Sequence, residues 1–199
     1  MHRSTVALAL MSVLMSAMAA SQSPDNDFMQ AREQLMSAVF EVTVSGDPDV
    51  DFAHLMVAHQ SAALPMIKTV LAQTDDPTFT HAVERLAQQL NDDIDALNTW
   101  LERYDTPDLG ADADVIRQAY QTALDEYAQQ RGDFVVEGDE NWVFANAMLW
   151  HQSLVITLDQ LMLNHSVDAQ LRILAGDGVR HANRDIAELR NWMQTRELE

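Results

Sequence analysis

Residues 46–61 read GDPDVDFAHLMVAHQS, and residues 138–153 read GDENWVFANAMLWHQS. The two stretches align without a gap and share Gly-Asp, Phe-Ala and Met-x-x-His-Gln-Ser at matching places. The same offset places Asp76 on Asp168 and Trp100 on Trp192. Matches that cluster at one offset indicate an internal duplication, and we assign the repeats to residues 46–104 and 138–196.

Each repeat predicts two helices. Asp47 and Pro48 are good residues for a helix start, because Asp accepts hydrogen bonds from free amides and Pro fits the first helical position. A second helix begins at Asp76, and Pro65 is expected to kink the first one. Residues then recur every three or four positions, as on the buried face of a bundle helix: Phe52, Met56, His59, Ala63 and Met66, matched by Phe144, Met148, His151, Val155 and Leu158.

One more helix is expected before each repeat, over about residues 24–40 and about residues 113–130, with residues 104–112 as the linker between the halves. The predicted fold is all-α. It is a ferritin-like four-helix bundle made of two duplicated αα-hairpins plus two flanking helices, in a single domain over residues 24–199.

The first 19 residues have the pattern of a signal peptide: a basic start, a short apolar run and small residues before Ala20. The apolar run is too short for a comfortable membrane span. We therefore expect a secreted or periplasmic mature chain with no membrane segment after cleavage. The chain has no cysteine, which excludes disulfides and thiolate ligands, and its formal net charge of −19 argues against nucleic acid as a partner.

The middle of the last predicted helix has lost bulk relative to its counterpart. Gly178 and Ala182 stand where the first repeat has Leu86 and Leu90, while Trp150 replaces an alanine of the first repeat. We expect the Trp150 indole to occupy the space that Gly178 and Ala182 leave.

The first repeat resembles the domain of unknown function 305 family, whose members are secreted or periplasmic helical bundles. The family motif is approximately Gly-Asp-x-Asp-x-x-Phe-x-x-x-Met-x-x-His-His-x-x-Ala, with a Met three residues later. The residues that match it are Gly46, Asp47, Asp49, Phe52, Met56, His59, Ala63 and Met66. The resemblance is good over residues 46–104 and weaker over residues 138–196.

Some members of this family are regarded as copper-binding proteins that use Met and His, so the resemblance implies copper as a possible cofactor. This sequence departs from the family pattern at the second His, which is Gln60 in one repeat and Gln152 in the other. Further along, the family has the pattern Gln-x-x-Glu-Ile-x-x-Met-x-x-Trp-Leu. Here the Gln of that pattern is Leu90 or Ala182, and its Met is Leu97 or Leu189.

The candidate metal ligands are Met56, His59, Met148 and His151, with Met66 as an accessory ligand. Thioether and imidazole are donors that suit Cu(I), and residues three apart on a helix lie within one turn. If the repeats pack about a two-fold axis, the two Met-His pairs face each other. The alternative is a structural or interaction module, in which Met fills the core and the histidines are bonded internally.

Other chemistry has little support in the sequence. Because the chain lacks cysteine, a phosphate-binding glycine loop and a nucleophile–base pair, we expect that it is not an enzyme. The Glu-x-x-His signature of a di-iron centre is also missing. His181 is a weaker ligand candidate beside Asp185, and His54, His81 and His165 are expected at the surface. The physiological partner and the oligomeric state do not follow from the sequence.

Overall fold

The structure is a computed structural model that describes residues 24–130 and 138–197. The predicted signal peptide, residues 1–19, lies outside the described residues. The described elements are α1 (Pro24–Ser37), the short 3-10 helix η1 (Ala38–Glu41), α2 (Pro48–Gln73), α3 (Pro77–Tyr104), α4 (Ala113–Gln129), α5 (Glu140–His165) and α6 (Ala169–Glu197).

The helix boundaries repeat with the same offset as the sequence. α5 begins and ends 92 residues after α2, α6 begins 92 residues after α3, and α4 ends 92 residues after α1. Each half of the described chain is therefore a set of three helices, and the duplication includes the flanking helices that precede the two predicted repeats.

Glycine and aspartate begin the first long helix of each half. Gly46 and Gly138 have φ angles of +102° and +124°, in a region that favours glycine. A Cβ at Gly46 would lie 2.4 Å from the backbone oxygen of Ala113. The Asp47 carboxylate then accepts hydrogen bonds from two amides of α2, and Asp139 accepts one from Trp142. The two equivalent helix starts therefore have the same chemical basis.

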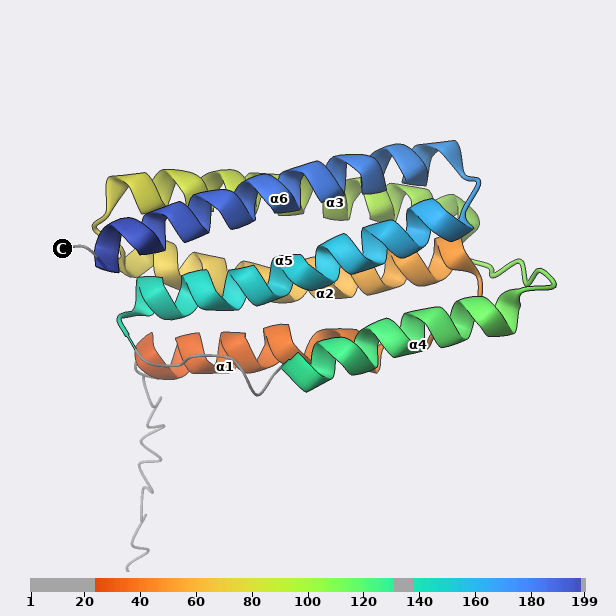
Figure 1. The fold of residues 1–199 in the computed structure, drawn as a ribbon, viewed down its shortest axis with the longest axis horizontal. Coiled ribbons are helices and arrows are strands. Elements are labelled where there is room, and N and C mark those ends of the chain that lie inside the picture. Colours follow the sequence, from red (N-terminus) through yellow and green to blue (C-terminus); the bar gives the residue numbers. More distant parts are fainter. Residues whose placement is uncertain (1–23, 131–137, 198–199) are drawn as a thin grey trace, which may run out of the picture.

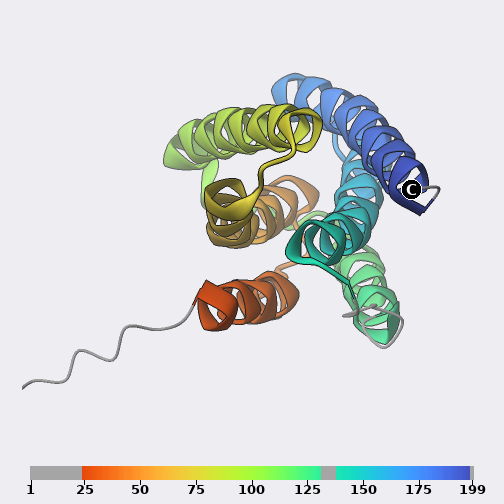
Figure 2. The ribbon, with the colours of Figure 1, turned by 90° about the vertical axis from the view of Figure 1, so that its left-hand side faces the viewer.

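Helices α2, α3, α5 and α6 form a four-helix core (Figures 1 and 2). α1 packs on α2 and α4 packs on α5, both on the side away from α3 and α6. α2 and α5 lie side by side and run in opposite directions. The prediction of an all-α fold is confirmed, and the described residues contain no strand. The specific likeness to ferritin stays a prediction.

Two reciprocal hydrogen bonds join the halves at opposite ends of the bundle. The indole of Trp192 on α6 donates to Asp76 at the start of α3, at 2.8 Å. The indole of Trp100 on α3 donates to Asp168 at the start of α6, at 3.4 Å. These equivalent contacts show that the two halves are related by an approximate two-fold axis.

The buried core consists of two apolar clusters with polar residues between them. On α2, Met56 belongs to one cluster and Ala63 to the other, and His59 and Gln60 lie between the two. On each of the other three core helices a polar residue also separates the clusters. These residues are the half-buried Asp93 on α3 and the buried His151 and Gln152 on α5 and Asp185 on α6. We call this set of six residues the polar level.

Helix α2 is long and apolar enough, by length and composition, to cross a membrane. No membrane-spanning segment was expected in this part of the sequence. Its apolar character has another physical explanation, because α2 contacts α1, α3 and α5 and has buried residues along its whole length. A core helix of a bundle needs this composition.

Candidate functional site

His59 on α2 and His151 on α5 meet at the centre of the polar level. Both side chains are fully buried. Their rings stack, with centroids 3.9 Å apart and an interplanar angle of 22°. The structure thus places the two equivalent histidines in one common environment, because α2 and α5 cross in opposite directions at this level.

Most of the ring nitrogens in this pair lack a hydrogen-bond partner among the described residues. His59 Nε2 lies 3.1 Å from the backbone oxygen of His151. Since a carbonyl can only accept, Nε2 carries the proton and His59 Nδ1 keeps a free lone pair. Both ring nitrogens of His151 are also buried without a partner. Unsatisfied buried nitrogens of this kind require an explanation, and a bound metal ion is one.

Burial keeps both rings uncharged at neutral pH. It lowers the pKa of His59 to about 4, although the bond to the carbonyl of His151 acts in the opposite direction. The pKa of His151 lies well below its usual value because of burial and the neighbouring His59. Neutral imidazoles are the form that binds metals.

The stacked arrangement limits how one ion could be shared. The lone pair of an imidazole nitrogen lies in the plane of its ring, and these two planes are nearly parallel. An ion at a normal distance of about 2 Å in the plane of one ring lies outside the plane of the other. As arranged, the pair offers one well-directed lone pair, and a second bond requires one ring to turn.

The predicted sulfur ligands do not converge on one point. Met56 belongs to one apolar cluster, and Met148 and Met66 belong to the other. Because α2 and α5 are antiparallel, Met56 and Met148 flank the histidine pair on opposite sides, about 9 Å apart along the helix axes at a rise of about 1.5 Å per residue. The structure therefore brings together His59 and His151, and leaves one methionine on each side.

One further side chain contacts the histidine pair, and it was not among the predicted site residues. The Tyr127 ring of α4 lies edge-on to His59, with centroids 5.6 Å apart. It stacks on the indole of Trp150, with centroids 3.6 Å apart. The Tyr127 hydroxyl and the Trp150 indole nitrogen are both buried without a partner among the described residues. The spacing of Tyr127 from Tyr120 and Leu124 places all three on one face of the helix expected over residues 113–130, and this was the available signal.

The expectation that Trp150 fills the space at Gly178 was wrong. The nearest atoms to a Cβ placed on Gly178 belong to the Asp159 side chain, with Oδ2 at 2.3 Å. The space above Gly178 is therefore filled by a carboxyl group. The indole lies against Tyr127 instead, because α4 covers this part of α5.

Glutamines occupy the two positions where the family pattern has its second histidine. Gln60 donates to Asp93 at 3.4 Å, and Gln152 donates to Asp185 at 3.0 Å. Burial raises the pKa of Asp93 to about 6 and raises the pKa of Asp185. These two pairs point from α2 and α5 toward α3 and α6, whereas His59 contacts Tyr127 on α4. In place of a second histidine pair, the chain has two equivalent amide–carboxyl pairs.

The remaining histidines are not assembled with this pair. His54 bonds to Asp105 at an exposed site, at 2.6 Å, and His81 and His165 are exposed. His181 on α6 is partly buried and interacts electrostatically with Asp185. In the ranges that the structure describes, no group of three or more His, Cys, Asp or Glu side chains is placed to hold a metal ion.

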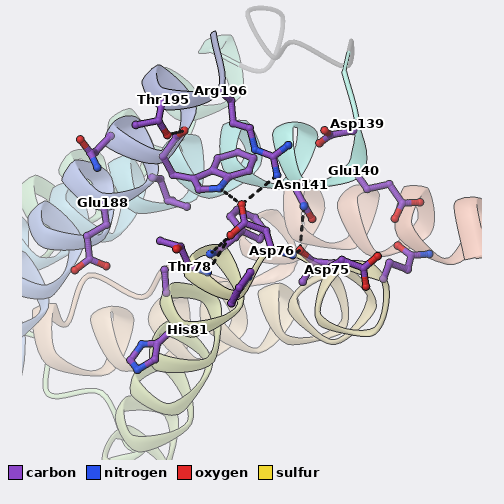
Figure 3. Close-up of a pocket in the computed structure, with 18 of the residues that line it drawn as sticks. Asp75, Asp76, Thr78, His81, Asp139, Glu140, Asn141, Glu188, Thr195 and Arg196 are labelled. Atoms are coloured by element: carbon purple, nitrogen blue, oxygen red, sulfur yellow. Dashed lines mark hydrogen bonds and ion pairs between the residues drawn. The ribbon is translucent and has the colours of Figure 1, made fainter. Parts of the chain in front are cut away.

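A surface hollow of about 1330 Å³ lies at one end of the bundle, between the starts of α3 and α5 and the end of α6 (Figure 3). Asp76 is at its centre and binds both Trp192 and Arg196. Burial alone would raise the pKa of Asp76, but bonds from two backbone amides, Trp192 and Arg196 lower it to about 2. Asn141 donates to Thr74 nearby, at 3.0 Å. These contacts join the two halves, so we assign the hollow a structural role.

The fold and the site define an all-α protein with a four-helix core, built from two equivalent halves that meet at a buried histidine pair. Residues 49–133 match the model of the family described as Domain of unknown function (DUF305). Over these residues, which run from α2 into the segment after α4, the chain is similar to this family. No curated protein and no solved structure matches the chain.

Proposed function

We propose that this protein binds a soft metal ion, Cu(I), at the buried histidine pair. The observation that carries the proposal is the hydrogen bonding of His59, which leaves one of its two ring nitrogens without a partner. Its Nε2 is fixed on the backbone oxygen of His151, so that its Nδ1 lone pair is free in a fully buried place. A histidine that binds a metal usually donates its other nitrogen to such an oxygen. When bound, Cu(I) would supply a soft, monovalent acceptor for nitrogen and thioether donors.

The proposed ligands have different roles in binding. His59 supplies the free lone pair, and His151 lies against it with both ring nitrogens without partners. Met56 lies one helical turn before His59, and Met148 lies one turn before His151, so each imidazole has a thioether on its own side. Met66 is seven residues beyond His59, about 10 Å along α2, and would have at most an accessory role.

The environment of the pair favours a single positive charge. The pair is fully buried, it lies between two apolar clusters, and neither imidazole has a hydrogen bond or ion pair to a carboxylate among the described residues. The cost of burying an ion rises steeply with its charge, and no carboxylate is bonded to the pair to offset a second charge. This supports Cu(I) over a divalent ion.

The test is an anaerobic titration of the chain from Ala20 onward with Cu(I) against a competing chelator. We expect stoichiometric binding that the His59→Ala/His151→Ala double variant loses. The matched control is His54→Ala/His81→Ala, which removes two exposed histidines and should bind as the wild type does. Circular dichroism verifies that each variant is folded. If the wild type fails to compete with the chelator, or the buried-pair variant still binds, the protein is better described as a scaffold or interaction module.

We also propose that the protein acts outside the cytoplasm, in the periplasm or after secretion. The signal-like pattern of residues 1–19 and the lack of cysteine support this location. Mass spectrometry of the exported protein should find a chain that begins at Ala20.

A further inference from the structure

A second buried group lies outside the histidine pair, on the part of α5 that faces α6. The Asp159 side chain is 1% exposed, and its Oδ2 has no hydrogen-bond partner among the described residues. A Cβ on Gly178 would lie 2.3 Å from this oxygen, so the carboxyl group fits only because residue 178 has no side chain. We call this arrangement the Asp159–Gly178 notch.

The first half of the molecule shows what the notch replaces. The positions equivalent to Asp159 and Gly178 are Ile67 and Leu86, and both of these side chains are 2% exposed. Two bulky apolar residues thus pack in one half, whereas the other half has a carboxyl group in the space of a missing leucine. Burying a carboxyl group in place of an apolar one costs free energy, which makes the notch a candidate for a role other than packing.

The surroundings of the notch disfavour a negative charge. Burial, and to a smaller extent the charge of the nearby Asp93 on α3, raises the pKa of Asp159 to about 9. Tyr120 on α4 is the other titratable group that interacts with Asp159, and its own pKa is raised mainly by burial. Gly178 on α6 brings no charge. No cation on a described segment of α2, α3, α4 or α6 lowers the pKa of Asp159.

We propose that the Asp159–Gly178 notch is a proton-binding site that makes the packing of α6 on α5 depend on pH. In the folded chain the carboxyl group keeps its proton and is neutral. When it releases that proton to solvent water, a carboxylate with no partner remains between two helices. The charged group can regain hydration only if α6 moves away from α5 at the notch, so ionisation weakens this contact.

The sign of the effect follows from the raised pKa. The folded state holds the proton more tightly than the unfolded chain, in which the pKa of an Asp side chain is about 4. The bound proton stabilises the folded state in full below about pH 4, and this stabilisation is lost as the pH rises through about 9. Between these values the ratio of folded to unfolded chain should fall about tenfold per pH unit because of Asp159 alone.

The experiment compares the metal-free full chain with Asp159→Asn, which keeps the shape and removes the titration. Urea unfolding from pH 5 to pH 9 should show a steadily growing advantage for the variant. Asp125→Asn, at an exposed position of α4, is the matched control and should follow the wild type. The double variant Asp159→Ile/Gly178→Leu, which restores the packing of the first half, should also lose this pH dependence.

Infrared spectroscopy tests the proton directly. A carbonyl band of a protonated carboxyl group should be present in the wild type at pH 7 and reduced in Asp159→Asn. The proposal would be overturned if the free energy of unfolding changed equally with pH in the wild type and Asp159→Asn, or if both proteins had the same carboxyl band. Because metal is absent from these experiments, their outcome is independent of Cu(I) binding.

Discussion

Gly176 and Gly178 lie two residues apart on α6, and the structure predicts opposite effects for the same substitution. At Gly176 a new Cβ meets only Arg180 Nη1, at 4.0 Å, so Gly176→Ala should stabilise the protein by about 0.5–1 kcal/mol through helix propensity. At Gly178 the Cβ collides with the Asp159 carboxyl group, so Gly178→Ala should destabilise it by about 1–3 kcal/mol. Urea unfolding of both variants measures the difference. Equal gains would mean that Asp159 does not occupy the notch.

The sequence predicted some contacts of single residues and missed others. It predicted that His59 and His151 would share an interior, because equivalent residues of a duplicated helix meet at a two-fold axis. The same axis separates Met56 from Met148. Each methionine precedes its histidine by three residues, and because the two helices are antiparallel, the methionines lie on opposite sides of the histidine pair. The contact of Trp150 with Tyr127 depends on how α4 packs on α5, and no local pattern in the sequence contains that information.

At the scale of helices, Asp76 at the start of α3 and Asp168 at the start of α6 are equivalent residues that accept different numbers of hydrogen bonds. Asp76 accepts from two amides and also binds Trp192 and Arg196. Asp168 accepts from the amide of Leu171 and has a longer bond from Trp100. Asp76→Ala should therefore cost about 2 kcal/mol and Asp168→Ala about 1 kcal/mol.

Chemical unfolding at pH 7 tests this difference, because the lowered pKa of Asp76 keeps it ionised there and its contribution is lost only when the pH falls toward about 2. Trp192→Phe removes the indole donor and leaves the helix cap intact, so it should account for part of the loss at Asp76. A larger loss for Asp168→Ala than for Asp76→Ala would contradict the assignment.

The helices themselves were well predicted by the sequence. The starts at Asp47 and Asp76 follow from capping chemistry, and the second half repeats them at the same offset. The end of the first helix was less accurate. It was expected near residue 40, but α1 ends at Ser37 and continues as the 3-10 helix η1. Helix ends of this kind depend on the packing of the following loop, which the periodicity of apolar residues does not describe.

Across the whole molecule, two kinds of buried titratable group are uncharged at pH 7: the histidine pair between the two apolar clusters, and Asp159 in the notch. The histidine pair and the Asp159–Gly178 notch respond to pH in opposite senses. The buried imidazoles resist protonation, and the buried carboxyl group resists ionisation. The histidine pair and Asp159 are therefore both expected to be uncharged at pH values between about 4 and about 9, and the acid and alkaline limits of this range can each be assigned to particular residues by substitution.

Protonation of the buried histidines at low pH gives a prediction for the stability of the whole bundle. The pKa of His59 is lowered to about 4, so the unfolded chain binds protons on this residue at a higher pH than the folded chain does. The neutral His59 ring stabilises the folded state in full above about pH 6.5, and this stabilisation is lost as the pH falls through about 4. For one such histidine the loss is on the order of 3 kcal/mol, and His151 should add to it. Urea unfolding from pH 7 to pH 4 should show a steeper loss for the wild type than for His59→Gln/His151→Gln, while His54→Gln should match the wild type. A wild-type profile no steeper than that of the double variant would mean that the two rings are accessible to protons in the folded protein, and the buried, uncharged pair on which the metal site depends would then have to be abandoned.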